Sequence, residues 1–394
     1  YYATVDALDS CLEQKEQAIF EEAFQKAKKI KTKQEKLEKQ LAALQKKKKQ
    51  HTPISVGRVT KKHIAEILSK QIHTSVDTLL RDEWEALVAV EKHIKKELFG
   101  QDAVIEDLIQ TLRHAYLKNT KTKKPLASYL FVGPSGVGKT ALAKHLAREL
   151  YHDEKALIKF DMSEFAESHS VSKLLGSPAG YIGHKERNRF TDEMKQRPYA
   201  VLLFDEIDKA HTDVRRLLFQ ILDEGELSDS AGKKIYFHHA IVIMTSNVGA
   251  EHYKTGGDFG FGNPTTETAV KTRNKKIEHS LKEYMSPALM GRIDKTCFFS
   301  PLSETAVEQI VKKHISELSK HLQTIKQIQI TPSQQSIRTL AKKTYNKDTG
   351  AREVEQKISQ IIHGLVIPLL QQSEKEKKKK KFTLSEKNGT IHLA

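Results

Sequence analysis

The stretch Gly133-Pro-Ser-Gly-Val-Gly-Lys-Thr140 decides the fold of this chain. It matches the phosphate-loop pattern G-x-x-x-x-G-K-[ST] in full, after an apolar run at residues 128–132 and before an amphipathic stretch. Its glycines let backbone N–H groups surround phosphate oxygens, and the next helix adds the positive end of its dipole. We expect Lys139 to reach the β- and γ-phosphates of ATP and Thr140 to bind Mg²⁺. The predicted phosphate-binding residues are Gly133, Pro134, Ser135, Gly136, Val137, Gly138, Lys139 and Thr140.

Short apolar strands alternate with amphipathic helices from residue 128 onward. The predicted strands cover residues 128–132, 157–161, 200–204, 240–245 and 296–299. This alternation is typical of βαβ units, so the sequence predicts an α/β fold with a mostly parallel sheet. Before this region, residues 8–50 contain no Gly or Pro and predict one long helix with a narrow apolar stripe, and two short helices are predicted at residues 61–71 and 76–98. After Pro301 the chain is predicted to be mainly helical up to residue 371, with one strand at residues 328–330. A hairpin of residues 381–384 and 390–393 follows, with its turn at Asn388-Gly389.

Besides the phosphate loop, an acidic motif supports a nucleotide site. The apolar run at residues 201–204 ends in Asp205 and Glu206, and the run at residues 241–244 leads to Asn247. Adjacent strand residues point to opposite faces, so we assign Asp205 to Mg²⁺ and Glu206 to the attacking water as general base. Asn247 is predicted to orient water or contact the γ-phosphate, because the carboxyl ends of parallel strands form the ligand crevice. The alternatives without a nucleotide are that Asp205 and Glu206 cap a helix and that Asn247 is an ordinary turn residue.

The charge of the chain is local. Its 394 residues carry 66 Lys and Arg against 50 Asp and Glu, a net charge of +16, and residues 28–49 and 374–381 supply +12 of it. No aromatic residues interleave these lysines, so we interpret them as solvated surface and not as a nucleic-acid site.

No apolar run reaches the ~18 residues of a membrane span. Cys11 and Cys297 form neither a disulfide framework nor a metal cluster, which favours a reducing compartment. The chain starts at Tyr1, and we interpret it as a fragment or a processed product.

Together these residues resemble the AAA+ ATPase family, and within it the Clp unfoldase branch. The resemblance runs from about residue 20 to the C-terminus and is dense at residues 161–165, 176–183, 205–211 and 244–249. It is similar to the second, C-terminal ATPase module of the two-ring Clp proteins. This implies an AAA+ three-layer αβα core with a C-terminal α+β lid. The predicted domains are a middle-domain-like long helix or coiled coil (1–57), a helical connector (58–127), the large ATPase domain (128–300) and the lid (301–394).

The resemblance also assigns residues that spacing alone does not reveal. Gly180, Tyr181, Ile182 and Gly183 resemble the axial-pore loop, in which an aromatic side chain grips a threaded polypeptide. Residues 184–190 depart from the acidic and Gly-rich run usual in the family. Arg292 resembles the arginine finger that reaches a neighbouring subunit's γ-phosphate, although Gly291 stands where the family usually has Asn. Arg352 resembles the second sensor in the lid. Leu98 and Phe99 resemble the apolar residues of the adenine pocket, or they are simply core.

Two further segments favour the ClpC type. Residues 24–30 resemble the UVR-like motif of the ClpC middle domain, and Phe259, Gly260 and Phe261 stand where ClpC carries a tripeptide that docks the ClpP peptidase. The resemblance therefore implies a homo-hexameric ATP-dependent unfoldase that threads unfolded or tagged proteins, feeds a ClpP-type peptidase, and acts in the cytoplasm or an organelle matrix of bacterial descent. The alternatives are a disaggregase without peptidase, a nucleic-acid motor, and a catalytically silent scaffold. We expect no membrane and no nucleic-acid partner.

Overall fold

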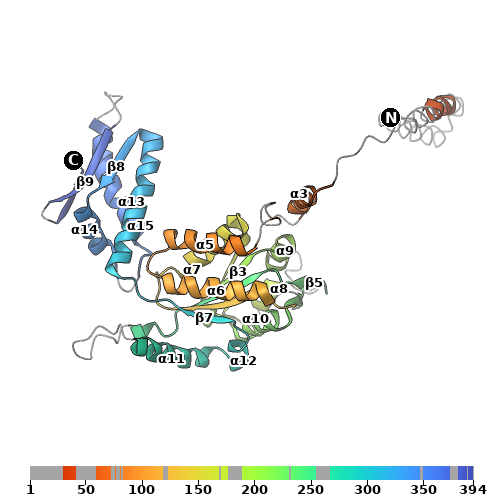
Figure 1. The fold of residues 1–394 in the computed structure, drawn as a ribbon, viewed down its shortest axis with the longest axis horizontal. Coiled ribbons are helices and arrows are strands. Elements are labelled where there is room, and N and C mark those ends of the chain that lie inside the picture. Colours follow the sequence, from red (N-terminus) through yellow and green to blue (C-terminus); the bar gives the residue numbers. More distant parts are fainter. Residues whose placement is uncertain are drawn as a thin grey trace. The chain divides into compact units, whose positions relative to one another are not determined.

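Figure 1 shows the computed structural model of the chain. It describes residues 30–40, 59–71, 76, 80, 83–118, 123–167, 170–175, 189–229, 232–253, 267–346, 349–372, 380–387 and 389–393. The chain divides into two compact units, Tyr1–Thr60 and Lys61–Ala394. In the first unit residues 30–40 are helical, as predicted, and the rest of the predicted helix over residues 8–50 lies outside the described residues. The second unit begins with helix α3 (Lys61–Gln71), also as predicted.

A five-stranded sheet forms the centre of the second unit, and all its neighbouring strands are parallel. The strand order is β2-β3-β6-β1-β7, so β1 is covered on both edges. This confirms the predicted α/β fold, with each strand boundary within one residue of the prediction. The strands are β1 (Ala127–Val132), β2 (Leu157–Asp161), β3 (Val201–Asp205), β6 (Ile241–Ser246) and β7 (Lys295–Phe298).

Helices cover both faces of this sheet, which confirms the three-layer αβα core. Alternate residues of β1 belong to two separate clusters: Leu130 and Val132 to one, Tyr129 and Phe131 to the other. Both faces are apolar because both are buried. One cluster includes side chains of α5 (Glu83–Glu97), α6 (Asp102–Lys118) and α7 (Lys139–Tyr151). The other includes side chains of α8 (Ser170–Leu175), α9 (Arg189–Gln196), α10 (Thr212–Glu224), α11 (Glu267–Tyr284) and α12 (Pro287–Met290).

The small C-terminal domain has its own core. Helices α13 (Glu304–Lys326), α14 (Gln334–Thr344) and α15 (Val354–Gln372) pack with a sheet in the order β10-β9-β8. Strand β8 (Ile328–Pro332) pairs parallel with β9 (Lys380–Lys387), which pairs antiparallel with β10 (Thr390–Leu393). The predicted helical lid, its strand and its terminal hairpin are therefore confirmed, and Gly389 of the turn has a φ of 74°.

Some elements were not predicted, or were predicted with other bounds. Strands β4 (Glu226–Ser228) and β5 (Lys234–Tyr236) form a short antiparallel hairpin, and each has only one buried residue. Three residues are too few to show a period of two, so the sequence pattern does not reveal them. Helix α6 was also missed, and the helix predicted at residues 76–98 is described as α5 from Glu83. The 3₁₀ helices are η1 (Glu154–Ala156), η2 (Met162–Phe165), η3 (Ile207–Lys209) and η4 (Ala250–Tyr253).

None of the helices in the described part of the chain is both long and apolar enough to cross a membrane.

Candidate nucleotide site

The phosphate loop connects the end of β1 to the start of α7. Lys139 is the first residue of α7, so the N-terminal N–H groups of this helix border the loop. Gly136 has a φ of 71°, and a Cβ atom built on it would lie only 2.0 Å from the carbonyl oxygen of Thr349. The loop therefore needs glycine here both for its left-handed backbone and for the close approach of the small domain.

Lys139 is held inside the loop. Its side chain is nearly buried, and its Nζ donates hydrogen bonds to the carbonyl oxygens of Gly133 (2.6 Å) and Pro134 (2.7 Å). A third bond goes to Oδ1 of Asn247 at 2.8 Å. Burial lowers the pKa of Lys139 to about 8, and nearby carboxylates act in the opposite direction. The structure thus brings the predicted lysine and the predicted asparagine into direct contact.

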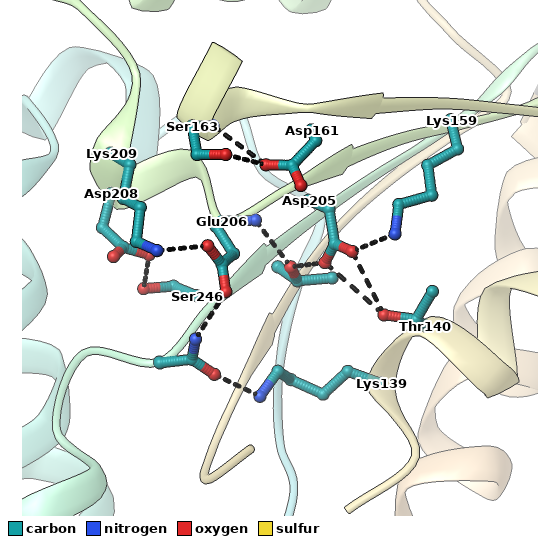
Figure 2. A network of polar contacts seen from close by, with 12 residues as sticks. Lys139, Thr140, Lys159, Asp161, Ser163, Asp205, Glu206, Asp208, Lys209 and Ser246 are labelled. Carbon is teal, nitrogen blue, oxygen red and sulfur yellow. Dashed lines mark hydrogen bonds and ion pairs between the residues drawn. The ribbon is translucent and has the colours of Figure 1, made fainter. Parts of the chain in front are cut away.

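The Asp205 carboxylate lies at the carboxyl end of β3 and has contacts on both oxygens (Figure 2). The Thr245 hydroxyl donates to its Oδ1 at 2.5 Å, and Lys159 Nζ lies 2.6 Å from its Oδ2. The Thr140 hydroxyl lies 3.4 Å from the same Oδ2. The two residues predicted to bind Mg²⁺ are therefore neighbours, as the sequence pattern requires.

The oxygen atoms of Thr140 and Asp205 suit Mg²⁺, which prefers hard oxygen ligands. Mg²⁺ in phosphate-handling sites is commonly bound by one or two protein oxygens together with substrate phosphates and water. The described residues contain no group of three or more His, Cys, Asp or Glu side chains placed to hold a metal ion. The donor set therefore fits a metal ion that shares its ligands with a bound nucleotide.

Glu206 adopts a left-handed backbone conformation, with φ 58° and ψ 51°. Its N–H donates to the Thr245 hydroxyl (3.0 Å), its Oε2 lies 2.5 Å from Lys209 Nζ, and its Oε1 accepts a bond from Asn247 (3.3 Å). Our reason for separating the two carboxylates was wrong: β3 ends at Asp205, so strand alternation does not apply to Glu206. The left-handed turn separates them instead. Such a conformation is uncommon outside glycine and is found mainly where the surrounding structure enforces it.

Sequence reasoning missed three residues of this network. Lys159 and Lys209 each contact one of the two carboxylates (Figure 2). The Thr245 hydroxyl contacts the Asp205 carboxylate. Lys159 lies on β2, which pairs with β3 in register, so a polar residue near the carboxyl end of that strand was the available signal. Thr245 and Lys209 lie within the motifs already quoted. Their contacts depend on side-chain directions, which a linear pattern does not give.

The small domain contacts the phosphate loop through its backbone. The Ala351 N–H donates to the carbonyl oxygen of Gly136 at 2.9 Å, and a Cβ atom on Gly350 would lie 2.6 Å from the carbonyl oxygen of Ser135. Arg352 follows directly and lines the same cavity as the loop. This cavity, of about 260 Å³, joins residues of both domains. Its lining is Ser135, Gly136, Gly138, Lys139, Thr140, Ala141, Asp205, Glu206, Thr245, Asn247, Ala351 and Arg352.

Leu98 and Phe99 lie between the two domains rather than among those lining residues. A Cβ atom on Gly138 would lie 2.8 Å from Leu98 Cδ1, so Leu98 packs directly behind the loop. Phe99 packs against the core of the small domain. Their assignment to an adenine pocket stays a prediction.

Arg292 lies outside the cavity that holds Lys139. Its Nε lies 2.6 Å from Oδ1 of Asp223, and its guanidinium carbon lies 5.7 Å from the centre of the Phe219 ring. It lines a different cavity, together with residues such as Lys124 and Asp294. The predicted pore loop Gly180–Gly183 and the predicted docking tripeptide 259–261 lie outside the described residues.

Two family models match the part of the chain with the central sheet and the small C-terminal domain separately. A family model described as "AAA domain (Cdc48 subfamily)" matches residues 124–296, and one described as "C-terminal, D2-small domain, of ClpB protein" matches residues 302–383. A model of the Torsin family matches residues 77–165. The first two matches cover the phosphate loop, both carboxylates and the segment with Arg352.

Individual relatives match over nearly the whole chain. A probable ATP-dependent Clp protease ATP-binding subunit of Chlamydia pneumoniae is 34% identical over 94% of this chain and 44% of its own length. The chaperone protein ClpB of Oceanobacillus iheyensis is 32% identical over 98% of this chain and 48% of its own length. A closed state of Hsp104 with ATPγS and FITC-casein has a TM-score of 0.71 and 31% identity, over 85% of this chain and 56% of that one. The chain thus spans about half the length of the curated relatives it matches.

Proposed function

The chain belongs to the Clp/Hsp100 family of AAA+ ATPases, and we propose that it is the second ATPase module of a ring-shaped unfoldase that uses ATP to thread polypeptides. The observation that carries this proposal is one cavity that joins the phosphate loop, two strand-end carboxylates, Asn247 and the lid residue Arg352. That set contains a group for each task of ATP hydrolysis: phosphate binding, metal binding, water activation and nucleotide sensing.

The residue roles in this proposal follow from the contacts. Lys139 exchanges its present bonds to Gly133, Pro134 and Asn247 for phosphate oxygens. Thr140 and Asp205 would hold Mg²⁺, which would supply positive charge to neutralise the phosphates. Glu206 accepts the proton of the attacking water. Asn247 bonds both Lys139 and Glu206 in the present structure, so it lies between the phosphate-binding cation and the base, where it can contact the γ-phosphate once Lys139 has turned to phosphate.

Arg352 and Arg292 serve two different sites in this proposal. Arg352 lines the cavity of its own chain and senses the phosphate there. Arg292 lies at another cavity, so it acts on the nucleotide of a neighbouring chain, as an arginine finger does in trans. This division makes hydrolysis depend on assembly, and we propose a homo-hexameric ring. The domain boundaries at residues 57, 127 and 300 remain predictions within the same proposal.

The substrate of the ring is an unfolded or tagged polypeptide in this proposal. Tyr181, between Gly180 and Gly183, offers a broad apolar surface that contacts many different side chains. Relatives of both functional types match the chain, one named as a Clp protease subunit and one as ClpB. We favour coupling to a ClpP-type peptidase because Phe259 and Phe261, on a glycine-rich segment, suit an apolar cleft on a partner. A disaggregase without peptidase is the second candidate.

The variant Glu206→Gln tests the ATPase part of this proposal. It removes the proton acceptor and keeps the hydrogen-bonding shape, so ATP binding and assembly should persist while turnover falls to background. The measurement is phosphate release together with binding of a fluorescent ATP analogue. Turnover that persists at a substantial rate would show that another group accepts the proton.

Two variants outside the described residues test the polypeptide part. Tyr181→Ala should keep ATP turnover and lose unfolding of a tagged fluorescent protein. The double change of Phe259 and Phe261 to Ser should keep unfolding and lose degradation when a ClpP-type peptidase is added. Equal degradation by this double variant would count against docking through Phe259 and Phe261, whereas no degradation even by the unaltered chain would favour the disaggregase alternative.

A further inference from the structure

Helix α10 holds the side chain of Arg292 on its last turns. Asp223 contacts the guanidinium through Nε at 2.6 Å, and the ring of Phe219 lies 5.7 Å from the guanidinium carbon. Residues four apart on a helix lie on one face, so a carboxylate and an aromatic ring support one cation together. The Arg292 side chain is about 40% exposed and that of Asp223 about 31% exposed, so the pair lies at the surface, where a second chain can reach it.

The backbone of Arg292 is fixed independently of this ion pair. Its carbonyl oxygen lies 3.1 Å from the hydroxyl of Ser128, which is buried on β1. The Ser128 N–H donates to Oδ2 of Asp294 at 2.8 Å, and the Asp294 N–H donates back to the Ser128 carbonyl oxygen at 3.1 Å. The central sheet therefore anchors the main chain from the Arg292 carbonyl group to Asp294. What remains to be ordered is the long side chain itself.

Asp223 is a rigid support because the end of α10 is fixed as well. Gly225 caps the helix with an N–H bond to Ile221 at 3.0 Å, and a Cβ atom on Gly225 would lie 1.7 Å from the carbonyl oxygen of Lys123. Lys124 Nζ lies 3.6 Å from the Asp223 carboxylate. The carboxylate thus lies between two cations on a helix end that packs directly against a neighbouring backbone segment.

We propose that Asp223 is a positioning residue that presents Arg292 to the nucleotide of the neighbouring chain; this rests on the proposed function, in which Arg292 acts in trans. A guanidinium has five N–H donors, so an ion pair through Nε leaves the terminal nitrogens able to bind phosphate oxygens. Ordering an arginine side chain costs conformational entropy. Because Asp223 orders the Arg292 side chain before the reaction begins, this entropy is not lost in the transition state. Positioning groups raise rates in this way.

Mixed assemblies of two full-length variants test the proposal. The donor chain carries Glu206→Gln and keeps Arg292, and the acceptor chain carries Arg292→Ala and keeps Glu206. Turnover then occurs only in an acceptor chain that receives the finger of a donor chain. Asp223→Asn in the donor chain should lower this turnover roughly 10-fold, with an unchanged KM for ATP. Asp223→Glu in the donor should recover a substantial part of it.

Two comparisons separate positioning from a general structural effect. The same Asp223→Asn change in the acceptor chain has no Arg292 to act on, so any loss there measures folding or assembly alone. Asp213→Asn in the donor is the matched control, because Asp213 is also on α10 and also pairs with an arginine, Arg216, at 2.8 Å. We expect the Asp213 variant to leave turnover unchanged.

The outcomes are distinguishable. Equal losses with Asp223→Asn in donor and acceptor chains, or no loss in the donor, would overturn the role of Asp223 and leave the trans role of Arg292 intact. Mixed assemblies that show no turnover even with Asp223 unchanged would overturn the trans role of Arg292, and the present proposal with it.

Discussion

Thr245 connects the Asp205 carboxylate to the backbone of Glu206 through one buried hydroxyl. This hydroxyl donates to Oδ1 of Asp205 at 2.5 Å and accepts the N–H of Glu206 at 3.0 Å. The side chain is 1% exposed, so water cannot replace either bond without rearrangement. At the level of single residues, Thr245 therefore sets both the direction of the Asp205 carboxylate, the proposed metal ligand, and the backbone of Glu206, the proposed base.

Thr245→Val should separate this role from simple packing, because valine keeps the shape and lacks the hydroxyl. We expect a loss of about 1–3 kcal/mol in the free energy of unfolding, since a buried N–H and a carboxylate oxygen lose their partner. Turnover should fall about 10-fold, as is usual when a group that orients a site residue is removed. Denaturant unfolding and phosphate release give the two quantities. Thr245→Ser is the control, and a valine variant with unchanged turnover would contradict the argument.

The lowered pKa of Lys139 predicts that nucleotide binding depends on pH. Its pKa is lowered to about 8 by burial, whereas an unfolded lysine titrates near 10.5. Between these values the unfolded chain binds more protons than the folded chain, so this group makes stability rise with pH in that window. A bound phosphate acts in the opposite direction, because its negative charge favours the protonated ammonium. Nucleotide binding in the same window should therefore take up a proton.

The expected result is a proton uptake that grows as the pH rises through the pKa of Lys139, with an affinity for ATP that falls over the same range. Titration calorimetry in two buffers of different ionisation enthalpy measures the number of protons directly. Comparing about pH 7 with about pH 9 provides the internal control, since Lys139 is mostly protonated at the lower value. An uptake that does not increase between them would show that the lysine stays charged in the free site.

At the level of elements, two glycines determine how close the small domain lies to the phosphate loop. Gly350 has a φ of 61°, and its Cβ position would be 2.6 Å from the Ser135 carbonyl oxygen. The adjacent Ala351 N–H bonds the loop at Gly136. Any side chain at residue 350 therefore forces the two domains apart or strains the backbone, and with them the placement of Arg352.

Gly350→Ala should weaken nucleotide binding by at least about 1 kcal/mol, because it adds left-handed strain to the steric conflict. Gly364→Ala is a matched control in the same domain: Gly364 is in the middle of α15 and a Cβ atom there meets nothing within 4 Å. That change should raise stability by about 0.5–1 kcal/mol and leave binding unchanged. Equal affinities of the two variants for a fluorescent ATP analogue would argue against the domain contact.

The same elements show how far the sequence predicts this site. The apolar strands and the residues at their carboxyl ends were predictable, because a buried parallel strand is a continuous apolar run and its end borders the ligand crevice. The register of β2 against β3, which brings Lys159 to Asp205, was not predictable from either strand alone. Neither was the left-handed Glu206, since its conformation depends on Thr245, which is far away in the chain.

At the level of the whole molecule, one chain does not place all the groups of the proposed ATPase site in one cavity. Lys139, the two carboxylates and Arg352 share a cavity, and Arg292 lies at a different one, held by Asp223 of its own chain. A cation near the γ-phosphate in the transition state contributes about 10³-fold or more to hydrolysis in related phosphate-transfer sites. A chain without a neighbour should therefore bind nucleotide and turn it over slowly.

Turnover per chain should accordingly rise with chain concentration, in parallel with association measured by sedimentation velocity. Arg292→Ala should remove most of this rise, about 10³-fold at full assembly, because the neighbouring chain then supplies no cation. The dilute variant should bind an ATP analogue as tightly as the unaltered chain does, since Arg292 lies outside the cavity of its own chain that contains the phosphate loop. Arg216→Ala is the matched control, because this exposed arginine pairs with Asp213 on the same helix that supports Arg292. A turnover per chain that stays constant while the chain associates would show that hydrolysis needs no neighbour.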